Sequence, residues 1–158
     1  MRAGGALDPT ASVVIGDGLA AGAVAWALSG LPSSTSALVH GTSPLAAVAA
    51  AGTLLLGDDA PTVPLVVAGA VAHTALSLGW ATVLALTLPE RRTVAAGLAA
   101  GAAIAALDLG VVARRYPRIR SLGTPGQVAD HLAFGAVVAV VVARRRRRRR
   151  ARRSPVGG

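Results

Sequence analysis

Four titratable side chains lie within apolar stretches of this sequence and could carry proton chemistry: His73, Asp108, Asp130 and His131. Histidine changes its protonation near neutral pH, and Asp and His chains inside membranes serve as proton relays. This pattern predicts a proton or cation relay. The alternative is structural, with the same side chains forming hydrogen bonds between helices. The sequence leaves both interpretations open.

Other chemistries find less support in the residues. Two histidines that ligate a haem sit at matched depth among aromatic side chains, whereas His73 and His131 are expected at different depths. No metal-ligand spacing recurs, and the absence of cysteine excludes thiol chemistry. The serines that follow Pro32 lack the GxSxG elbow of a hydrolase. We therefore predict no cofactor, no metal ion and no enzymatic activity.

The composition indicates the elements that must position these side chains. The chain has 158 residues, of which 53% are hydrophobic and only 3% aromatic, and its mean hydropathy is +0.60. Such a chain belongs to the membrane class. Its many Ala and Gly residues suit helices that pack closely within lipid.

Four stretches are long and apolar enough to cross a bilayer, which takes about 20 residues of helix. They cover residues 9–29, 63–88, 93–113 and 125–143. Thr124 and Gln127 predict a capping box at the start of the last one. We expect an all-α bundle of four transmembrane helices that forms a single domain over residues 1–143.

The first loop holds a shorter apolar run, residues 45–56, which is too short to span. We predict an interfacial or re-entrant helix there, with a turn near residues 33–40. Arg2 and the apolar stretch after it resemble a signal peptide, but Asp17 interrupts the stretch, so we expect it to be retained.

Glycines spaced four apart predict where the helices pack. Gly18 and Gly22 form one such pair, and Gly97 and Gly101 form another. Successive helical residues turn by about 100°, so Asp108 shares the face of the second pair. The polar groups are therefore expected on packing faces, away from lipid.

Nine arginines follow the last stretch: Arg144, Arg145, Arg146, Arg147, Arg148, Arg149, Arg150, Arg152 and Arg153. Basic residues beside a span favour the cytoplasmic side, so we predict a cytoplasmic C-terminus in the bacterial cytoplasmic membrane. Residues 144–158 are expected to form a disordered tail. Binding of anionic lipid headgroups is favoured over nucleic acid, because no aromatic residues interleave the arginines.

The third loop opposes this orientation. With four spans it falls outside, yet it contains four arginines, against twelve inside from Arg2, the second loop and the tail (1 + 2 + 9). We expect Arg114, Arg115 and Arg118 to fold back toward Asp108 and Asp130. Partial neutralisation of their charges would lower the free-energy cost of placing this loop outside. Asp130 is then expected to face the third span or its arginine loop, and His131 a cleft that leads toward His73.

Four segments, SGLPSSTSALVHGTSPLAAVAAAGTLL, HTALSLGW, ALDLGVVARRYPRIR and QVADHLAFG, resemble a family of small multi-pass membrane proteins of actinobacteria. The resemblance covers most of residues 29–135 and implies the membrane class, with no activity attached. The sequence favours a structural or accessory subunit that acts through helix association, with a membrane-protein partner or a second copy of itself. A proton-linked small-solute transporter or channel that uses the buried Asp and His residues is the alternative.

Overall fold

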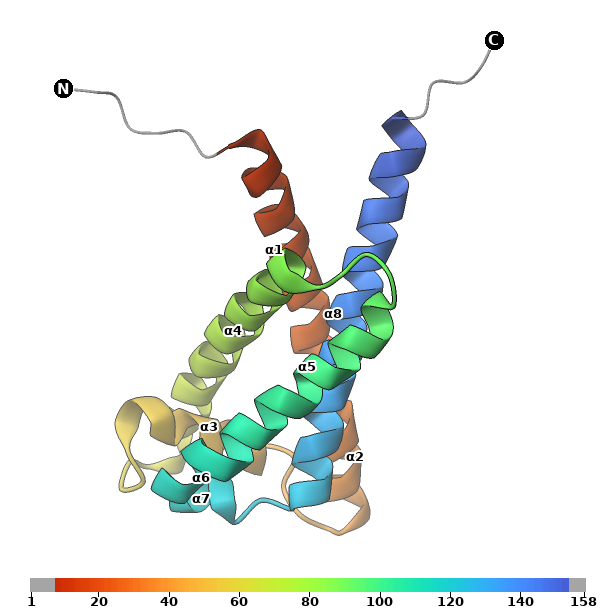
Figure 1. The fold of residues 1–158 in the computed structure, drawn as a ribbon. Coiled ribbons are helices and arrows are strands. Elements are labelled where there is room, and N and C mark those ends of the chain that lie inside the picture. Colours follow the sequence, from red (N-terminus) through yellow and green to blue (C-terminus); the bar gives the residue numbers. More distant parts are fainter. Residues whose placement is uncertain (1–7, 154–158) are drawn as a thin grey trace, which may run out of the picture.

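The computed structural model describes residues 8–153, and this part of the chain folds into helices and turns without a β-strand (Figure 1). The long helices are α1 (Pro9–Leu28), α4 (Thr62–Thr87), α5 (Thr93–Leu107) and α8 (Thr124–Arg153). Four helical segments are long and apolar enough to cross a membrane, which confirms the predicted all-α bundle of four spans. Arg2 and residues 154–158 of the expected tail lie outside the described residues.

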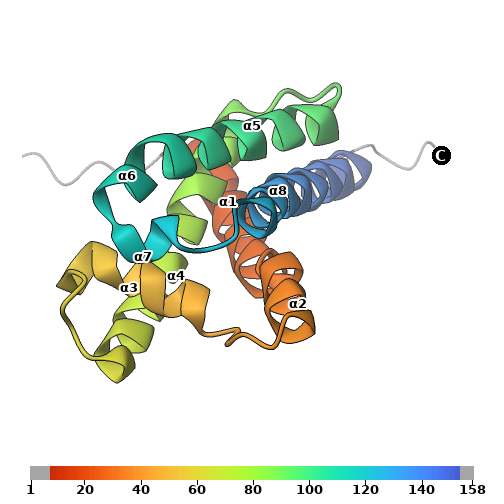
Figure 2. The ribbon, with the colours of Figure 1, turned by 90° about the horizontal axis from the view of Figure 1, so that it is seen from below.

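Short helices fill two of the connections. The first connection holds α2 (Leu31–Val39) and α3 (Ala46–Leu56), and the third holds α6 (Ala113–Arg115) and α7 (Pro117–Arg120). All four gather at one end of the bundle, which we call the loop end and which Figure 2 shows face on. The start of α1 and the end of α8 project at the opposite end, which we call the tail end, and the α4–α5 connection lies on that side of the bundle below them (Figure 1). The turn expected at residues 33–40 is the helix α2.

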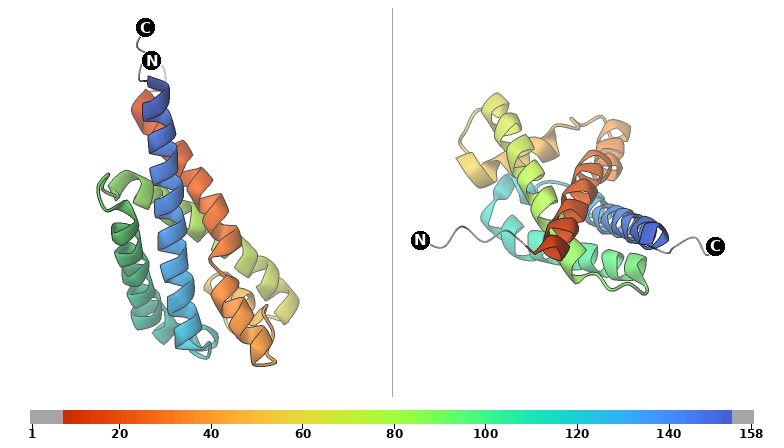
Figure 3. Two further views of the ribbon diagram at one scale, coloured as in Figure 1. Left: turned by 90° about the vertical axis from the view of Figure 1, so that its right-hand side faces the viewer. Right: turned by 90° about the horizontal axis from the view of Figure 1, so that it is seen from above.

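The bundle is assembled from close helix pairs. α1 packs against α4, α5 packs against α8, and α8 runs between α1 and α5 (Figure 3). Alanine and valine side chains fill the main core, with Ala21, Ala25, Ala81, Val138 and Val142 among its members. Small side chains bring the backbones close, as is usual within lipid.

The predicted packing glycines lie where these pairs touch: Gly18 and Gly22 face α4, and Gly97 and Gly101 face α8. A Cβ atom at Gly18 would overlap the Cα atom of Thr82, and one at Gly97 would overlap the carbonyl oxygen of Gly135. No larger residue fits at these two positions without moving the neighbouring helix.

α5 does not end as a regular helix. Its last turns widen into a π-helical segment, η1 (Asp108–Val112), before α6 begins. Such segments shift the register of the side chains that follow and are frequent at functional sites. Consecutive helices α4 and α5 pack against other partners rather than against each other, so the side of the bundle between them is open.

α8 continues without a break through the arginine run to Arg153 and has 30 residues. At a rise of about 1.5 Å per residue it is about 45 Å long. Residues 144–153, which we expected to be disordered, are therefore helical. Arginine is a good helix former, and several of these arginines contact the bundle, as described below.

Candidate functional site

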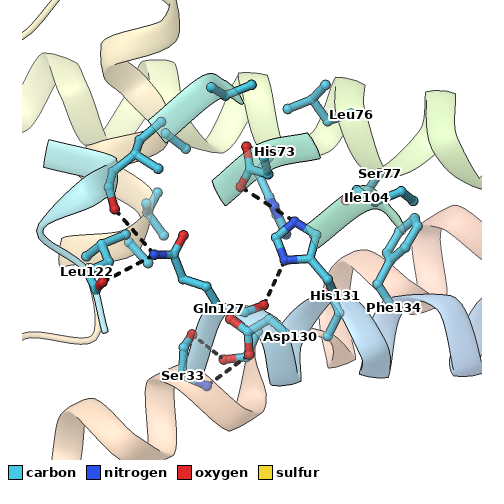
Figure 4. Close-up of a pocket in the computed structure, with 18 of the residues that line it drawn as sticks. Ser33, His73, Leu76, Ser77, Ile104, Leu122, Gln127, Asp130, His131 and Phe134 are labelled. Carbon is cyan, nitrogen blue, oxygen red and sulfur yellow. Dashed lines mark hydrogen bonds and ion pairs between the residues drawn. The ribbon is translucent and has the colours of Figure 1, made fainter. Parts of the chain in front are cut away.

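The four titratable residues singled out in the sequence line one cavity of about 490 Å³ near the loop end. His73 comes from α4, Asp108 from the first residue of η1, and Asp130 and His131 from α8. Figure 4 shows Asp130 and His131 reaching into this cavity from neighbouring positions on α8. Three separate elements thus bring their ionisable groups together in one half of the bundle.

Asp108 and His131 form a pair across the α5–α8 interface. The imidazole Nε2 atom lies 3.6 Å from the Asp108 Oδ2 atom. The Nδ1 atom lies 2.7 Å from the carbonyl oxygen of Gln127, and because a carbonyl can only accept, Nδ1 carries a proton. A separation of 3.6 Å is an ion-pair distance, so Nε2 of a protonated imidazole would face the Asp108 carboxylate with opposite charge.

Asp130 has a different partner from the one the sequence predicted. Its Oδ1 atom accepts a hydrogen bond of 2.9 Å from the backbone N–H of Ser33, near the start of α2. Asp130 therefore faces α2 instead of the third span, and it is His131 that faces the third span. Adjacent residues on a helix point about 100° apart, so Asp130 and His131 reach different neighbouring helices.

Aromatic side chains surround the polar groups. Trp80 and Phe134 line the cavity, and the ring of Trp26 lies 6.4 Å from the ring of His73 between centroids. The chain has only four aromatic residues, and three of them line or adjoin this cavity. An aromatic face attracts a cation that lies over it within about 6 Å.

Gln127 does not form the predicted capping box. Its amide nitrogen donates to the carbonyl oxygens of Ile119 and Leu122, at 3.3 and 3.4 Å. The amide therefore ties α8 to the preceding turn instead of accepting from the start of its own helix. With its own carbonyl on His131, Gln127 fixes one wall of the cavity.

The loop arginines do not reach the buried aspartates. Arg118 donates to the carbonyl oxygen of Asp58 at 3.0 Å, and its Nε atom lies 4.0 Å from the Asp58 carboxylate. Arg114 and Arg115 are exposed. The hypothesis that these arginines neutralise Asp108 and Asp130 is therefore wrong, and Arg118 instead links the third connection to the acidic end of the first.

A second charged cluster lies toward the tail end and was missed from the sequence. Asp17 is only 2% exposed, and its carboxylate pairs with Arg145 at 2.7 Å and with Arg149. A buried carboxylate needs such partners, because an unpaired charge there is very costly. The available signal was Asp17 itself, a carboxylate within an apolar span that needs a basic partner.

Two further arginines hold the end of α4 and the loop after it. Arg146 donates to the carbonyl oxygens of Ala85 and Leu88 at 2.9 Å, and Arg150 pairs with Glu90. The hydrogen bond and the charge of Arg150 lower the pKa of Glu90 below its ordinary value of 4.5. Four other arginines of the run have exposed side chains: Arg144, Arg147, Arg148 and Arg152.

Within residues 8–153, no three His, Cys, Asp or Glu side chains come close enough together to ligate a metal ion. The site consists of the cavity, the Asp108–His131 pair and the aromatic side chains of Trp80 and Phe134. No protein-family model matches the chain, and neither a curated protein nor a solved structure matches it, so its site is interpreted from its own geometry.

Proposed function

We propose that this multi-pass membrane protein binds a small organic cation in the cavity in exchange for a proton, as a proton-linked transporter does. The observation that supports this most is the convergence of Asp108, Asp130, His131 and His73 on one cavity of about 490 Å³. Residues that only held helices together would be expected to fill the space between them. These residues instead surround a space large enough for a small solute.

The charges that line the cavity favour a cationic solute. Asp108 and Asp130 contribute two carboxylates, and among residues 8–153 no arginine lines the cavity. The aromatic faces of Trp80 and Phe134 add a further attraction for positive charge. An anion in the same place would meet the carboxylates, and among the described lining residues only the two histidines could offset its charge.

The Asp108–His131 pair supplies the link to protons. With the imidazole protonated the pair is neutral, and with the imidazole neutral the pair carries one negative charge. A bound cation stabilises the deprotonated pair, so the cation enters as the proton leaves, and the net charge of the site is unchanged. High proton concentration reverses the exchange.

The accessory role favoured by the sequence has less support. It gave the buried Asp and His residues a purely structural role, whereas these residues line a cavity. The glycine faces are already covered, Gly18 and Gly22 by α4, and Gly97 and Gly101 by α8. A partner or a second copy of the chain would need another surface.

The arrangement of the arginines supports a cytoplasmic tail end. Arg91, Arg92 and the whole arginine run lie at that end, against four arginines at the loop end. The exposed arginines of α8 would then meet the anionic headgroups of the inner leaflet, at about 1 kcal/mol for each residue near the surface. The cavity, near the loop end, would open from the outer half.

Proton flux in liposomes tests this proposal. Protein is reconstituted with a pH-sensitive dye inside, and a gradient of tetramethylammonium is applied across the membrane. The wild-type protein is expected to move protons in the direction opposite to that of tetramethylammonium. Asp108→Asn and Asp130→Asn are expected to abolish this proton movement while the variants remain folded. Asp59→Asn, at an exposed loop position, serves as the matched control. Flux that is absent from wild-type protein, or unchanged in both variants, would overturn the proposal.

A further inference from the structure

The cavity adjoins an apolar groove between α4 and α5. This groove has a volume of about 270 Å³ and is lined by Trp80, Leu84, Ala100, Ala103, Ile104 and Leu107. Trp80, Ile104 and Leu107 also line the polar cavity, so the two spaces share a wall. Polar groups line the cavity and purely apolar walls line the adjoining groove.

The groove lies on the open side of the bundle. α4 and α5 are not closely packed there, and Leu107 is 46% exposed. In a bilayer this side faces the acyl chains of lipids. A ligand with an apolar chain could therefore enter sideways from the membrane without leaving its apolar surroundings.

Because the polar cavity and the apolar groove adjoin, we infer that the ligand is a cationic amphiphile, with its ammonium-like head between Asp108 and Asp130 and its alkyl chain in the α4–α5 groove. This inference rests on the proposed cation exchange and adds the ligand class. The carboxylates and aromatic faces of the cavity favour a cationic head group.

The dimensions fit a chain of moderate length. Eight residues separate Asp108 from Ala100 along the helix, and at a rise of about 1.5 Å per residue this is about 12 Å. A head beside Asp108 would place a linear alkyl chain past Ile104 and toward Ala100. The same direction along α4 leads from His73 past Trp80 to Leu84, so both walls of the groove follow the chain.

Two neighbouring alanines provide a matched pair of variants. Ala103 lines the groove and Ala102 does not, and both side chains are exposed on the same helix. Ala103→Phe would occupy the groove, whereas Ala102→Phe adds the same ring to a lipid-facing position. Because both positions are exposed, neither ring has to be forced into the core.

The experiment compares octyltrimethylammonium with tetramethylammonium, which has the same head and no chain. Protein is placed in nanodiscs of neutral lipid, and binding is measured by equilibrium dialysis with empty nanodiscs subtracted. We expect octyltrimethylammonium to bind more tightly than tetramethylammonium. Ala103→Phe should weaken the octyl compound about tenfold, as overpacking of a filled site does, and should leave tetramethylammonium unchanged. Ala102→Phe should alter neither.

Different results would overturn the proposed cation exchange and the inferred amphiphilic ligand. If Asp108→Asn and Asp130→Asn change the binding of neither cation, the proposed function itself is overturned. If binding needs these carboxylates but the octyl chain adds no affinity, or if the two Phe variants behave alike, the cation exchange stands and the amphiphile is rejected.

Discussion

Asp17 shows how a single charged residue organises this bundle. Its carboxylate is buried near the tail end of α1 and pairs with Arg145 and Arg149, which lie one turn apart on α8. The arginine side chains remain 47% and 31% exposed, so the carboxylate is enclosed while its partners reach it from the surface. The arginine run thus acts on the fold as well as on the charge of the tail end.

Asp17→Asn is expected to destabilise the protein. The change removes a charge-assisted hydrogen bond from Arg145 and an ion pair with Arg149. The loss of the hydrogen bond alone should lower the free energy of unfolding by about 1.5–3 kcal/mol. Unfolding by sodium dodecyl sulfate in mixed micelles, followed by circular dichroism, measures this. Asp59→Asn should stay within about 0.5 kcal/mol of the wild type. Equal stability of Asp17→Asn and Asp59→Asn would show that the buried cluster contributes nothing.

At this scale the sequence predicted which residues matter better than it predicted their partners. His73, Asp108, Asp130 and His131 line the same cavity, as residues expected on packing faces in one half of the membrane should. The partner of Asp130 was predicted wrongly, because a helical wheel gives the angle between two residues but not the rotation of the whole helix. Ser33 could not be anticipated, because its contribution is a backbone N–H group.

At the scale of the helices, the backbones of α1 and α4 lie so close together at Gly18 that no side chain fits between them. Gly16→Ala and Gly18→Ala separate this effect from helix propensity on the same helix. Nothing lies within 4 Å of a Cβ atom at Gly16, whereas one at Gly18 would overlap Thr82. We expect Gly18→Ala to cost about 1–3 kcal/mol of unfolding free energy. Gly16→Ala should be neutral or stabilise the helix by up to about 1 kcal/mol.

The thermal unfolding temperature in detergent compares the two alanine variants directly. A loss of stability confined to Gly18→Ala supports the close α1–α4 contact. Similar behaviour of both variants would argue against it.

The pair of Glu90 and Arg150 gives the α4–α5 connection a dependence on pH. Arg150 lowers the pKa of Glu90, which means that the folded protein favours the ionised carboxylate. The resulting stabilisation is present above the ordinary pKa of 4.5 and is lost as the pH falls through the lowered value. Wild-type protein should therefore be modestly more stable than Glu90→Gln at neutral pH.

The difference between wild type and Glu90→Gln should shrink as the pH is taken below 4.5. Melting temperatures of both proteins across this range provide the measurement. A difference that persists in acid, or that grows, would contradict the pairing.

Most element boundaries could be predicted, because apolar length and flanking prolines determine where a spanning helix begins and ends. The π-helical segment at Asp108 was not foreseen, since nothing in the local residue types distinguishes it from an ordinary turn of helix. The continuation of α8 to Arg153 was missed because a run of like charges was expected to repel itself. Contacts of Arg145, Arg146, Arg149 and Arg150 with other elements offset that repulsion.

For the whole molecule, the distribution of arginines predicts one orientation in the membrane. A reporter fused after Gly158 should be cytoplasmic, and one inserted after Thr42, between α2 and α3, should be external. Replacing residues 144–150 by Gln should give mixed orientation, because the four arginines of the loop end then compete.

That replacement also breaks the contacts of α8 with Asp17 and Glu90. A triple variant, Arg144→Gln with Arg147→Gln and Arg148→Gln, changes only exposed arginines and isolates the effect of charge. It should weaken the orientation bias without loss of stability. Reporters that read external at Gly158 in the wild type would contradict the orientation outright.

Proton release on cation binding tests the central claim most directly. Purified protein in weakly buffered detergent near neutral pH is titrated with tetramethylammonium, and the change in pH is recorded with an indicator dye. Wild-type protein should release about one proton for each cation bound, through linkage of the two equilibria. Asp108→Asn and His131→Gln, which break this pair, should release none, while Asp59→Asn should behave like the wild type. Cation binding without proton release in the wild type, or release that persists in both pocket variants, would contradict the account.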